Sequence, residues 1–275
     1  HQVQPSVGTG ELGPAHPGRA LDIALDHPTH ISFDPQGRMV IAAWHNSKIL
    51  RYDLGTGQVE TIAGTGERGH TGDGGPATEA SLNLPVATAF DGSGRMFIAD
   101  QANQCVRVVE TDGTIRRYAG NGRQGFSGDG GPATEARLYA PVGQSAQPTG
   151  RIALDAAGNL YIADTYNHRI RMVDTNGIIT TIAGTGSIGL GAGGYAGDEG
   201  PAVSAVLSSP SDVAVDSEGN LFIADSGNHC IRRIDRDGII TTLIGQAEEP
   251  GYGGDADHPK WARLRGPSWP MRRLK

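Results

Sequence analysis

The sequence repeats itself four times at an interval of about 60 residues. The triplet Ile-Ala-Asp is found at 98–100, 162–164 and 223–225, and a fourth copy, Ile-Ala-Ala, at 41–43. Two further markers keep the same rhythm: an apolar residue followed by Gly, and the loop Gly-Asp-x-Gly-Pro-Ala. Because independent markers share one period, the chain is built of repeats, each of which packs against its neighbours to bury its apolar faces.

Each repeat contains four short strand-like runs. In the last complete repeat the expected strands are Ser211–Asp216, Asn220–Ala224, Cys230–Asp235 and Ile239–Ile244. Asp-x-x-Gly segments separate the first two strands and the last two, and they supply the residues that tight turns require. A composition of Gly 42 and Pro 16 with 5% aromatic residues suits many short strands. Four antiparallel strands per repeat predict an all-β fold, a β-propeller in which each repeat forms one blade.

Two segments carry a family resemblance. Residues 164–171 read Asp-Thr-Tyr-Asn-His-Arg-Ile-Arg and residues 225–232 read Asp-Ser-Gly-Asn-His-Cys-Ile-Arg, each preceded by Asn-Leu-aromatic-Ile-Ala. They resemble the NHL-repeat motif, and the long Gly-Asp-Gly-Gly-Pro-Ala loops resemble those of bacterial secreted or cell-envelope NHL proteins. The resemblance covers roughly 28–245 and implies a propeller, usually of six blades, in an extracytoplasmic location. For function it implies a range, from protein and RNA binding to metal-dependent lyases.

We therefore expect one NHL propeller over 1–275, with four complete blades that form part of a six-bladed ring. Val7–Gly10 matches Ala63–Gly66 and is expected to be the end of an outermost strand whose own blade is missing. Further blades, or self-association, would then close the ring. The expected bounds are approximately 28–84, 85–147, 148–209 and 210–266 for the blades, and 1–27 and 267–275 for two partial blades.

Charge and motif content narrow the function classes. The net charge of −7 argues against broad nucleic-acid affinity, which depends on cationic side chains that displace counterions. No apolar run approaches the roughly 18 residues that would indicate a membrane span. The sequence lacks a Gly-x-Ser-x-Gly elbow, a phosphate loop and a Cys-x-x-Cys pair. We therefore expect no catalytic residues and no cofactor, and a protein that is not an enzyme.

The two cysteines occupy equivalent places in two repeats that are not adjacent. Cys105 and Cys230 each lie five residues after the Asp of their Ile-Ala-Asp triplet. Equivalent sites on non-adjacent blades lie beyond the ~7 Å Cα separation that a disulfide tolerates. Two free thiols are expected.

The first repeat departs from the others, and departures from a repeat are where function is expected. It has Ala43 in place of the Asp, followed by Trp44 and His45. In amidating lyases and gluconolactonase-like propellers, which this fold resembles, metal ligands project into the central channel from near the starts of inner strands. Only two of the four comparable residues can bind a metal, whereas a catalytic site needs at least three protein ligands. Those four residues are His30, Ala87, Gly150 and Asp212, so His30 and Asp212 are weak candidates for a divalent cation.

Residues that recur at equivalent places in several repeats are expected to be structural. An Asp before a turn commonly accepts backbone N–H groups, which is the role we expect for Asp100, Asp164 and Asp225. Inter-blade packing is expected of His168 and His229, and loop stabilisation of Asp73, Asp129 and Asp198. The recurrent arginines are expected to cover the sheet with their stems and pair with acids: Arg107, Arg171 and Arg232.

The leading hypothesis is a non-enzymatic scaffold that binds a protein or carbohydrate partner through its loop-rich face. The residues expected to contact the partner are His30, Trp44, His45 and Asp212. An insertion over 140–148 on this face is either a partner contact or a tolerated loop extension. Two alternatives remain: a metal-dependent lyase or hydrolase with its site at the central channel, and a single-stranded RNA binder.

Overall fold

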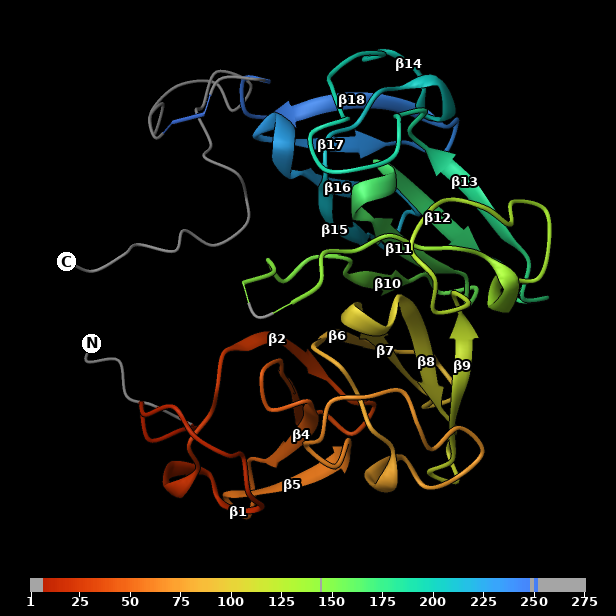
Figure 1. Ribbon diagram of the computed structural model, residues 1–275. Coiled ribbons are helices and arrows are strands. Elements are labelled where there is room, and N and C mark those ends of the chain that lie inside the picture. The colour runs from red at the N-terminus through yellow and green to blue at the C-terminus, as the bar shows by residue number, and fades with distance from the viewer. Residues whose placement is uncertain (1–6, 144, 248–249, 252–275) are drawn as a thin grey trace. The chain divides into compact units, whose positions relative to one another are not determined.

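A computed structural model describes residues 7–143, 145–247 and 250–251 (Figure 1). The chain divides into two compact units, 1–123 and 124–275, which are described separately. Apart from 3₁₀ turns, the described residues form only strands and loops. None of their helices is long and apolar enough to cross a membrane.

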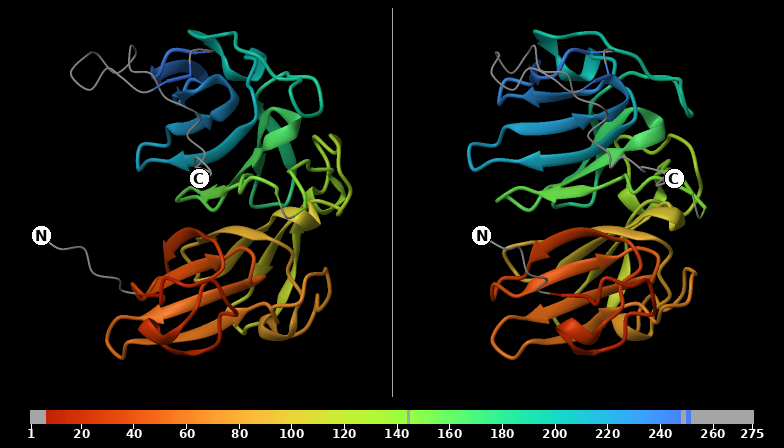
Figure 2. Two further views of the ribbon diagram at one scale, coloured as in Figure 1. Left: turned by 60° about the vertical axis from the view of Figure 1, so that its left-hand side comes forward. Right: turned by 90° about the vertical axis from the view of Figure 1, so that its left-hand side faces the viewer.

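The first unit contains two antiparallel sheets (Figure 2). The first has the order β1-β5-β4-β3-β2 and the second the order β6-β7-β8-β9. The strands are β1 Gly18–Arg19, β2 Pro28–Phe33, β3 Met39–Ala43, β4 Lys48–Asp53, β5 Gln58–Ala63, β6 Pro85–Phe90, β7 Met96–Asp100, β8 Cys105–Val109 and β9 Ile115–Ala119. The 3₁₀ turns are η1 Ala20–Asp22, η2 Ala77–Glu79 and η3 Gln101–Asn103.

The second unit repeats this plan. Its sheets have the orders β10-β11-β12-β13 and β14-β18-β17-β16-β15. The strands are β10 Ile152–Leu154, β11 Leu160–Asp164, β12 Arg169–Val173, β13 Ile179–Ala183, β14 Gly200–Pro201, β15 Pro210–Val215, β16 Leu221–Asp225, β17 Cys230–Ile234 and β18 Ile239–Ile244. The 3₁₀ turns are η4 Ala133–Glu135, η5 Thr165–Asn167, η6 Ala202–Ser204 and η7 Ser226–Asn228.

These sheets confirm the prediction of an all-β chain with four antiparallel blades of four strands each, two of which gain a short outer strand, β1 or β14. In the last sheet the strands β15 to β18 begin and end within one residue of the predicted bounds. The Asp-x-x-Gly turns form as expected: Asp216 Oδ1 accepts the backbone N–H groups of Glu218 and Asn220 at 2.9 Å each. Gly219 has a φ of +85°, which favours glycine. The expected partial blade 267–275 lies outside the described residues.

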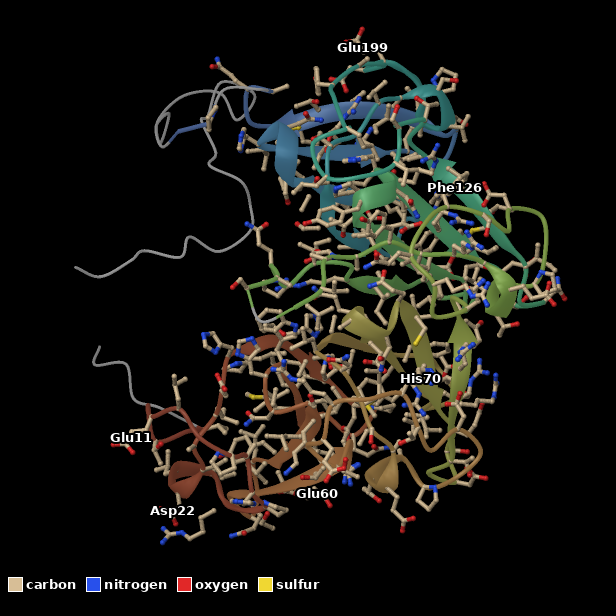
Figure 3. All side chains as sticks on the ribbon, in the orientation of Figure 1. Glu11, Asp22, Glu60, His70, Phe126 and Glu199 are labelled. Carbon is tan, nitrogen blue, oxygen red and sulfur yellow. The ribbon has the colours of Figure 1, made fainter. Side chains whose placement is uncertain are left out.

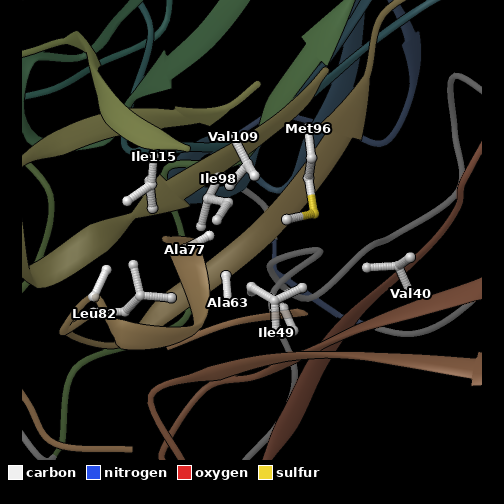
Figure 4. Packing of buried hydrophobic residues seen from close by; sticks show 11 residues of the cluster. Val40, Ile49, Ala63, Ala77, Leu82, Met96, Ile98, Val109 and Ile115 are labelled. Atoms are coloured by element: carbon white, nitrogen blue, oxygen red, sulfur yellow. The ribbon is translucent and has the colours of Figure 1, made fainter. Parts of the chain in front are cut away.

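In the first unit, apolar side chains of the two sheets form one core (Figure 4). Val40 and Ile49 of the first sheet belong to the same buried cluster as Met96 and Ile98 of the second. Ile49 and Ile98 are fully buried, and each stabilises the fold by about 1.5–3 kcal/mol relative to an exposed side chain. The second unit has an equivalent core, which includes Ile170 and Ile223. Adjacent blades within each unit are therefore held together by shared apolar side chains.

The Gly-Asp-x-Gly-Pro-Ala loops lie beside the outermost strand of the blade that follows them. Gly74 N–H donates to Ile115 O at 2.8 Å, and Ile115 N–H donates to Gly75 O at 2.9 Å. The later copies do the same through β13 and through the β14–β18 pair. Because unpaired backbone groups at a sheet edge invite non-native pairing, each loop protects the edge of the next blade.

The segment before the first blade has the same arrangement. Gly8 N–H donates to Ala20 O at 2.8 Å, as Gly64 N–H donates to Ala77 O at 2.9 Å in the next repeat. β1 pairs with β5 at the outer edge of the sheet. Residues from Val7 onward thus occupy the place that the end of β5 and its following loop occupy next to the second blade.

Candidate functional site

Three blades share a buried Asp–Asn pair at the turn between their second and third strands. In the third blade, Asp164 is 2% exposed and accepts the backbone N–H of Tyr139 at 2.8 Å and the Asn167 side-chain amide at 2.8 Å. Asp100 and Asp225 make the matching bonds in their own blades. Each carboxylate therefore ties the turn to the segment that precedes the innermost strand.

Burial raises the pKa of each of these carboxyl groups. The pKa of Asp100 is raised to about 7, and those of Asp164 and Asp225 to about 6, because desolvation penalises the charged form. Hydrogen bonds and a nearby guanidinium oppose this rise in all three blades. The groups are enclosed by their own blades, so they do not form a solvent-facing site.

The recurrent arginines are completely buried and anchor the loops. Arg171 Nη2 donates to Asp129 Oδ1 at 2.7 Å and to Ser127 O at 3.1 Å, and Nη1 lies 3.2 Å from Asp164 Oδ2. Arg107 and Arg232 bind the loop acids Asp73 and Asp198 in the same way. With no exposed side-chain area, these guanidinium groups are not positioned to contact RNA phosphates.

In two of the three loops an aromatic ring packs over the guanidinium group. The Phe126 ring lies 4.8 Å from the Arg171 guanidinium carbon and 4.0 Å from that of Arg169 (Figure 3). Tyr195 lies in the same way over Arg232, at 4.9 Å. These cation–π contacts complete the attachment of these two loops to their blades.

The first blade replaces this network with apolar side chains. Ala43 and Leu50, both fully buried, stand where the other blades have Asp and Arg. Asn46 compensates, because its Oδ1 accepts the Asp26 N–H at 2.9 Å and its Nδ2 donates to Gly13 O at 2.8 Å. The first blade thus lacks the buried Asp and Arg side chains of the other three blades and has Ala43 and Leu50 in their place.

Beside Asn46 the turn between β3 and β4 carries a cluster of imidazole and carboxylate groups. His45 Nδ1 lies 3.4 Å from Asp26 Oδ1, and His27 Nδ1 lies 2.5 Å from the same oxygen. The Trp44 ring stacks on His45 at 4.3 Å and is itself only 4% exposed. Sequence reasoning identified Trp44 and His45 but missed Asp26 and His27. The signal that was there to find is that both lie immediately before the innermost strand, facing the same turn.

His30 and Asp212 lie in different units. His30 Nδ1 is 3.4 Å from the Thr88 backbone nitrogen within the first unit. In the second unit, Asp212 Oδ2 lies 3.1 Å from Arg151 Nη1. Burial raises the pKa of Asp212, and Arg151 opposes the rise. A carboxylate paired with a guanidinium is a poor ligand for a cation.

Arg151, not Gly150, stands at the position of Asp212 in the third blade. The carbonyl of Arg151 accepts the Ala163 N–H at 3.0 Å, and Asp212 is the residue opposite Ala224. The sequence alignment was wrong by one residue because the insertion over 140–148 obscures where the strand begins.

His168 fastens a second insertion to the third blade. It is fully buried, its Nε2 lies 2.6 Å from Gly189 O, and its Nδ1 accepts the Ser209 N–H at 2.9 Å. Burial lowers its pKa, consistent with a neutral ring that donates from Nε2. A Cβ at Gly193 would lie 2.6 Å from His168 Nδ1, so glycine is needed there for the loop to approach.

The loop that His168 holds exposes large apolar side chains. It runs from 184 to 197, whereas the corresponding loops run only from 64 to 72 and from 120 to 128. Ile188 is 51% exposed and Leu190 is 77% exposed. The remaining repeated residue, His229, is half-buried and has the same left-handed backbone as His168. The two cysteines, Cys105 and Cys230, are buried and free, as expected.

One family model and several known proteins match the sequence of this chain. The family model of the Teneurin NHL domain matches residues 120–192 and 191–251. Protein SUPPRESSOR OF QUENCHING 1, chloroplastic, of Arabidopsis thaliana is 27% identical over 264 residues, which cover 90% of this chain and 24% of that protein. Teneurin-m of Drosophila melanogaster is 33% identical over 179 residues, which cover 62% of this chain and 6% of that protein.

NHL repeat-containing protein 2 of Bos taurus is 31% identical over 149 residues, covering 51% of this chain and 19% of that protein. The chain thus spans at most 24% of the length of these relatives. A solved structure of a streptogramin B lyase superposes with a TM-score of 0.50 at 13% identity, covering 87% of this chain and 59% of that chain. At this identity the similarity concerns the fold alone. The repeat, its four blades and these matches together show that the chain belongs to the NHL-repeat β-propeller family.

Proposed function

We propose that this chain is a non-enzymatic NHL scaffold that binds a protein partner through the loops of its second unit. The observation that carries the proposal is the exposure of Ile188 and Leu190 in an inserted loop that is fixed at its base. Apolar side chains held in place by a rigid scaffold favour protein binding, because little conformational entropy is lost when they are covered.

The neighbouring insertion supports the same surface. Val142, within the insertion over 140–148, is 49% exposed. Tyr139 and Tyr166 pack edge to face at 5.3 Å, and Tyr166 O accepts the Gly189 N–H at 2.8 Å. The insertion over 140–148 therefore begins directly after Tyr139, and the loop over 184–197 is bonded to the backbone of Tyr166. Trp44, which the sequence predicted to contact the partner, is 4% exposed, so its ring is not available to stack on a carbohydrate.

Site-specific photo-crosslinking tests the proposal. A photoreactive amino acid placed at Leu190 should give a discrete crosslinked protein, while the same amino acid at Val203, which is 53% exposed, should not. The partner identified in this way should bind the purified chain saturably, and the I188S/L190S variant should weaken that binding at least about tenfold. Equal crosslinking at both positions, or unchanged binding by the variant, would refute the proposal.

We also propose that a further blade covers the free face of the first sheet. Ile31 and Phe33 of β2 are each 57% exposed. Their equivalents in the second blade, Thr88 and Phe90, are covered by the first blade, with Thr88 Oγ1 2.6 Å from Ser32 Oγ. The blade would come from the same polypeptide or from a second copy of this chain.

Crosslinking from Phe33 distinguishes the two sources. A crosslink to an NHL strand of the same polypeptide indicates ring closure within one chain, and a crosslink between two copies indicates self-association. Leu54, exposed at 61% in the β4–β5 turn, is the control position. Crosslinking no stronger from Phe33 than from Leu54 would contradict the proposal.

We propose in addition an extracytoplasmic location, in the periplasm, on the cell surface or secreted. The resemblance of the Gly-Asp-Gly-Gly-Pro-Ala loops to those of secreted NHL proteins supports it. Fractionation of cells that produce the protein, followed by immunoblotting of each fraction, checks the location. Recovery in the cytosolic fraction alone would contradict it.

A further inference from the structure

The cluster of Asp26, His27 and His45 brings three metal-ligating side chains to one point of the first unit. One ligand atom from each lies within 4.8 Å of the other two. Asp26 and His27 immediately precede β2, and His45 lies in the turn between β3 and β4. The three donors thus come from two segments that the first sheet holds side by side.

Hydrogen bonds of the backbone position these metal-ligating residues before a metal ion binds. The N–H of His45 donates to Asp26 O at 3.3 Å, and the N–H of Asp26 donates to Asn46 Oδ1 at 2.9 Å. His27 has a φ of +50°, a left-handed conformation that directs its side chain relative to Asp26. A site that is preorganised in this way loses little entropy on binding an ion.

The other repeats provide an internal comparison. The bond from His45 to Asp26 recurs as Ala102 N–H to Asn83 O at 3.0 Å and as Gly227 N–H to Ser208 O at 2.8 Å. The backbone of this turn is therefore common to the blades and needs no histidine. The residues matching Asp26, His27 and His45 are Asn83, Leu84 and Ala102 in the second blade, and Ser208, Ser209 and Gly227 in the fourth. All three positions thus carry metal-ligating side chains in the first blade, whereas the matching positions of the second and fourth blades carry no histidine or carboxylate.

The surroundings suit an ion that enters from one side. The His45 side chain is 14% exposed, that of Asp26 33% and that of His27 52%. Trp44 stacks on the buried side, and His45 Nε2 is buried without a hydrogen-bond partner.

We propose that Asp26, His27 and His45 bind a zinc ion, with solvent as the fourth ligand on the exposed His27 side. Zinc takes imidazole nitrogen and carboxylate oxygen at about 2.0–2.2 Å in a tetrahedral arrangement, which separates neighbouring donors by about 3.4 Å. The His45 Nδ1 to Asp26 Oδ1 distance of 3.4 Å already matches this separation. The 2.5 Å hydrogen bond from His27 to Asp26 would lengthen as zinc replaces the shared proton.

Titration of the purified, chelator-treated chain with zinc chloride tests the site. Calorimetry should show one zinc per chain. H27Q should weaken zinc binding by more than the roughly 10–100-fold that loss of an outer-shell partner causes, and H45A should act in the same direction. Cobalt(II) in place of zinc should give the intense visible absorption of a four-coordinate ion, and H27Q should abolish it.

His70 provides the matched control. It lies in the same unit, but beside the cationic side chains of Arg107 and Arg117, where a metal ion would be repelled. H70Q should therefore retain full affinity for zinc. His27 is half-exposed, so H27Q tests the site even if H45A fails to fold. Absence of stoichiometric binding, or equal losses in H27Q and H70Q, would overturn the assignment.

Discussion

Arginine is ordinarily a surface residue, yet here it is among the largest fully buried side chains. The two Nη atoms of Arg171 donate to Asp129, Asp164 and the carbonyl of Ser127. The first blade shows that an apolar pair, Ala43 and Leu50, can take the place of such an ion pair. Replacing one member alone is a different matter, because the other charge is then left buried and uncompensated.

We therefore predict that R171L lowers the free energy of unfolding by about 3–5 kcal/mol, because Asp164 loses its buried partner. The double variant D164A/R171L should lose less than the sum of the two single variants, with a coupling of about 1–3 kcal/mol. Urea denaturation of the wild type, both single variants and the double variant measures the cycle. Strict additivity would show that the pair does not act as a unit.

A second prediction at this scale concerns pH. Burial raises the pKa of Asp100 from its ordinary value of 3.8 to about 7. Because the folded state binds this proton more tightly than the unfolded state, the contribution of Asp100 to stability is present below about pH 4 and is lost as pH rises through about 7. D100N should flatten the pH dependence of the urea midpoint between pH 4 and 8. A profile unchanged from that of the wild type would contradict the shift.

At the scale of the element, each Gly-Asp-x-Gly-Pro-Ala loop behaves as an additional edge strand. The first glycine of each loop approaches a 3₁₀ turn closely: a Cβ on Gly128 would lie 2.7 Å from the Ala136 Cα. Gly130, two residues later, has a similar positive φ of +80°, but nothing lies within 4 Å of where its Cβ would be. Substitutions at Gly128 and Gly130 can therefore distinguish the cost of backbone strain from the cost of steric overlap.

We predict that G130A costs about 1–2 kcal/mol of stability, the usual cost of a left-handed non-glycine residue. G128A should cost a further ~1–3 kcal/mol, because the backbone at Ala136 must also move. Thermal or urea unfolding of both variants measures the difference. Equal losses would indicate that the close approach is relieved without cost.

The strands and turns were predictable because they follow local rules. Asp216 and Gly219 mark a turn wherever they stand, and the strands beside them were placed to within one residue. Burial of Arg171 was not predictable, since its partner Asp129 is 42 residues away and reaches it only through the folded loop. Of the Asp26, His27 and His45 site, only His45 was predicted from the sequence. None of the repeat markers covers the two residues before β2.

At the scale of the whole molecule, each unit has its own core and its own buried cysteine. Burial raises the pKa of Cys230 to about 12 and that of Cys105 well above its usual value. Both thiols should therefore be slow nucleophiles in the folded protein.

We predict that native protein reacts negligibly with Ellman's reagent, and that both thiols react in strong denaturant. In the C105S and C230S variants, the remaining thiol reports the opening of one unit at a time. Its labelling rate as a function of denaturant measures the stability of that unit. Rapid labelling of either cysteine without denaturant would contradict the burial.

The placement of the loops has a consequence for synthesis and for engineering. Because each loop precedes the blade whose outer edge it covers, it leaves the ribosome before that outer strand is made. The outer strand can thus pair with the loop as soon as it has been synthesised. This shortens the time during which its unpaired backbone groups can bind other nascent chains. A transferable cassette should accordingly be cut ahead of the loop, near residue 70, rather than at the start of β6. A chimera joined at β6 would import a blade without its edge cover.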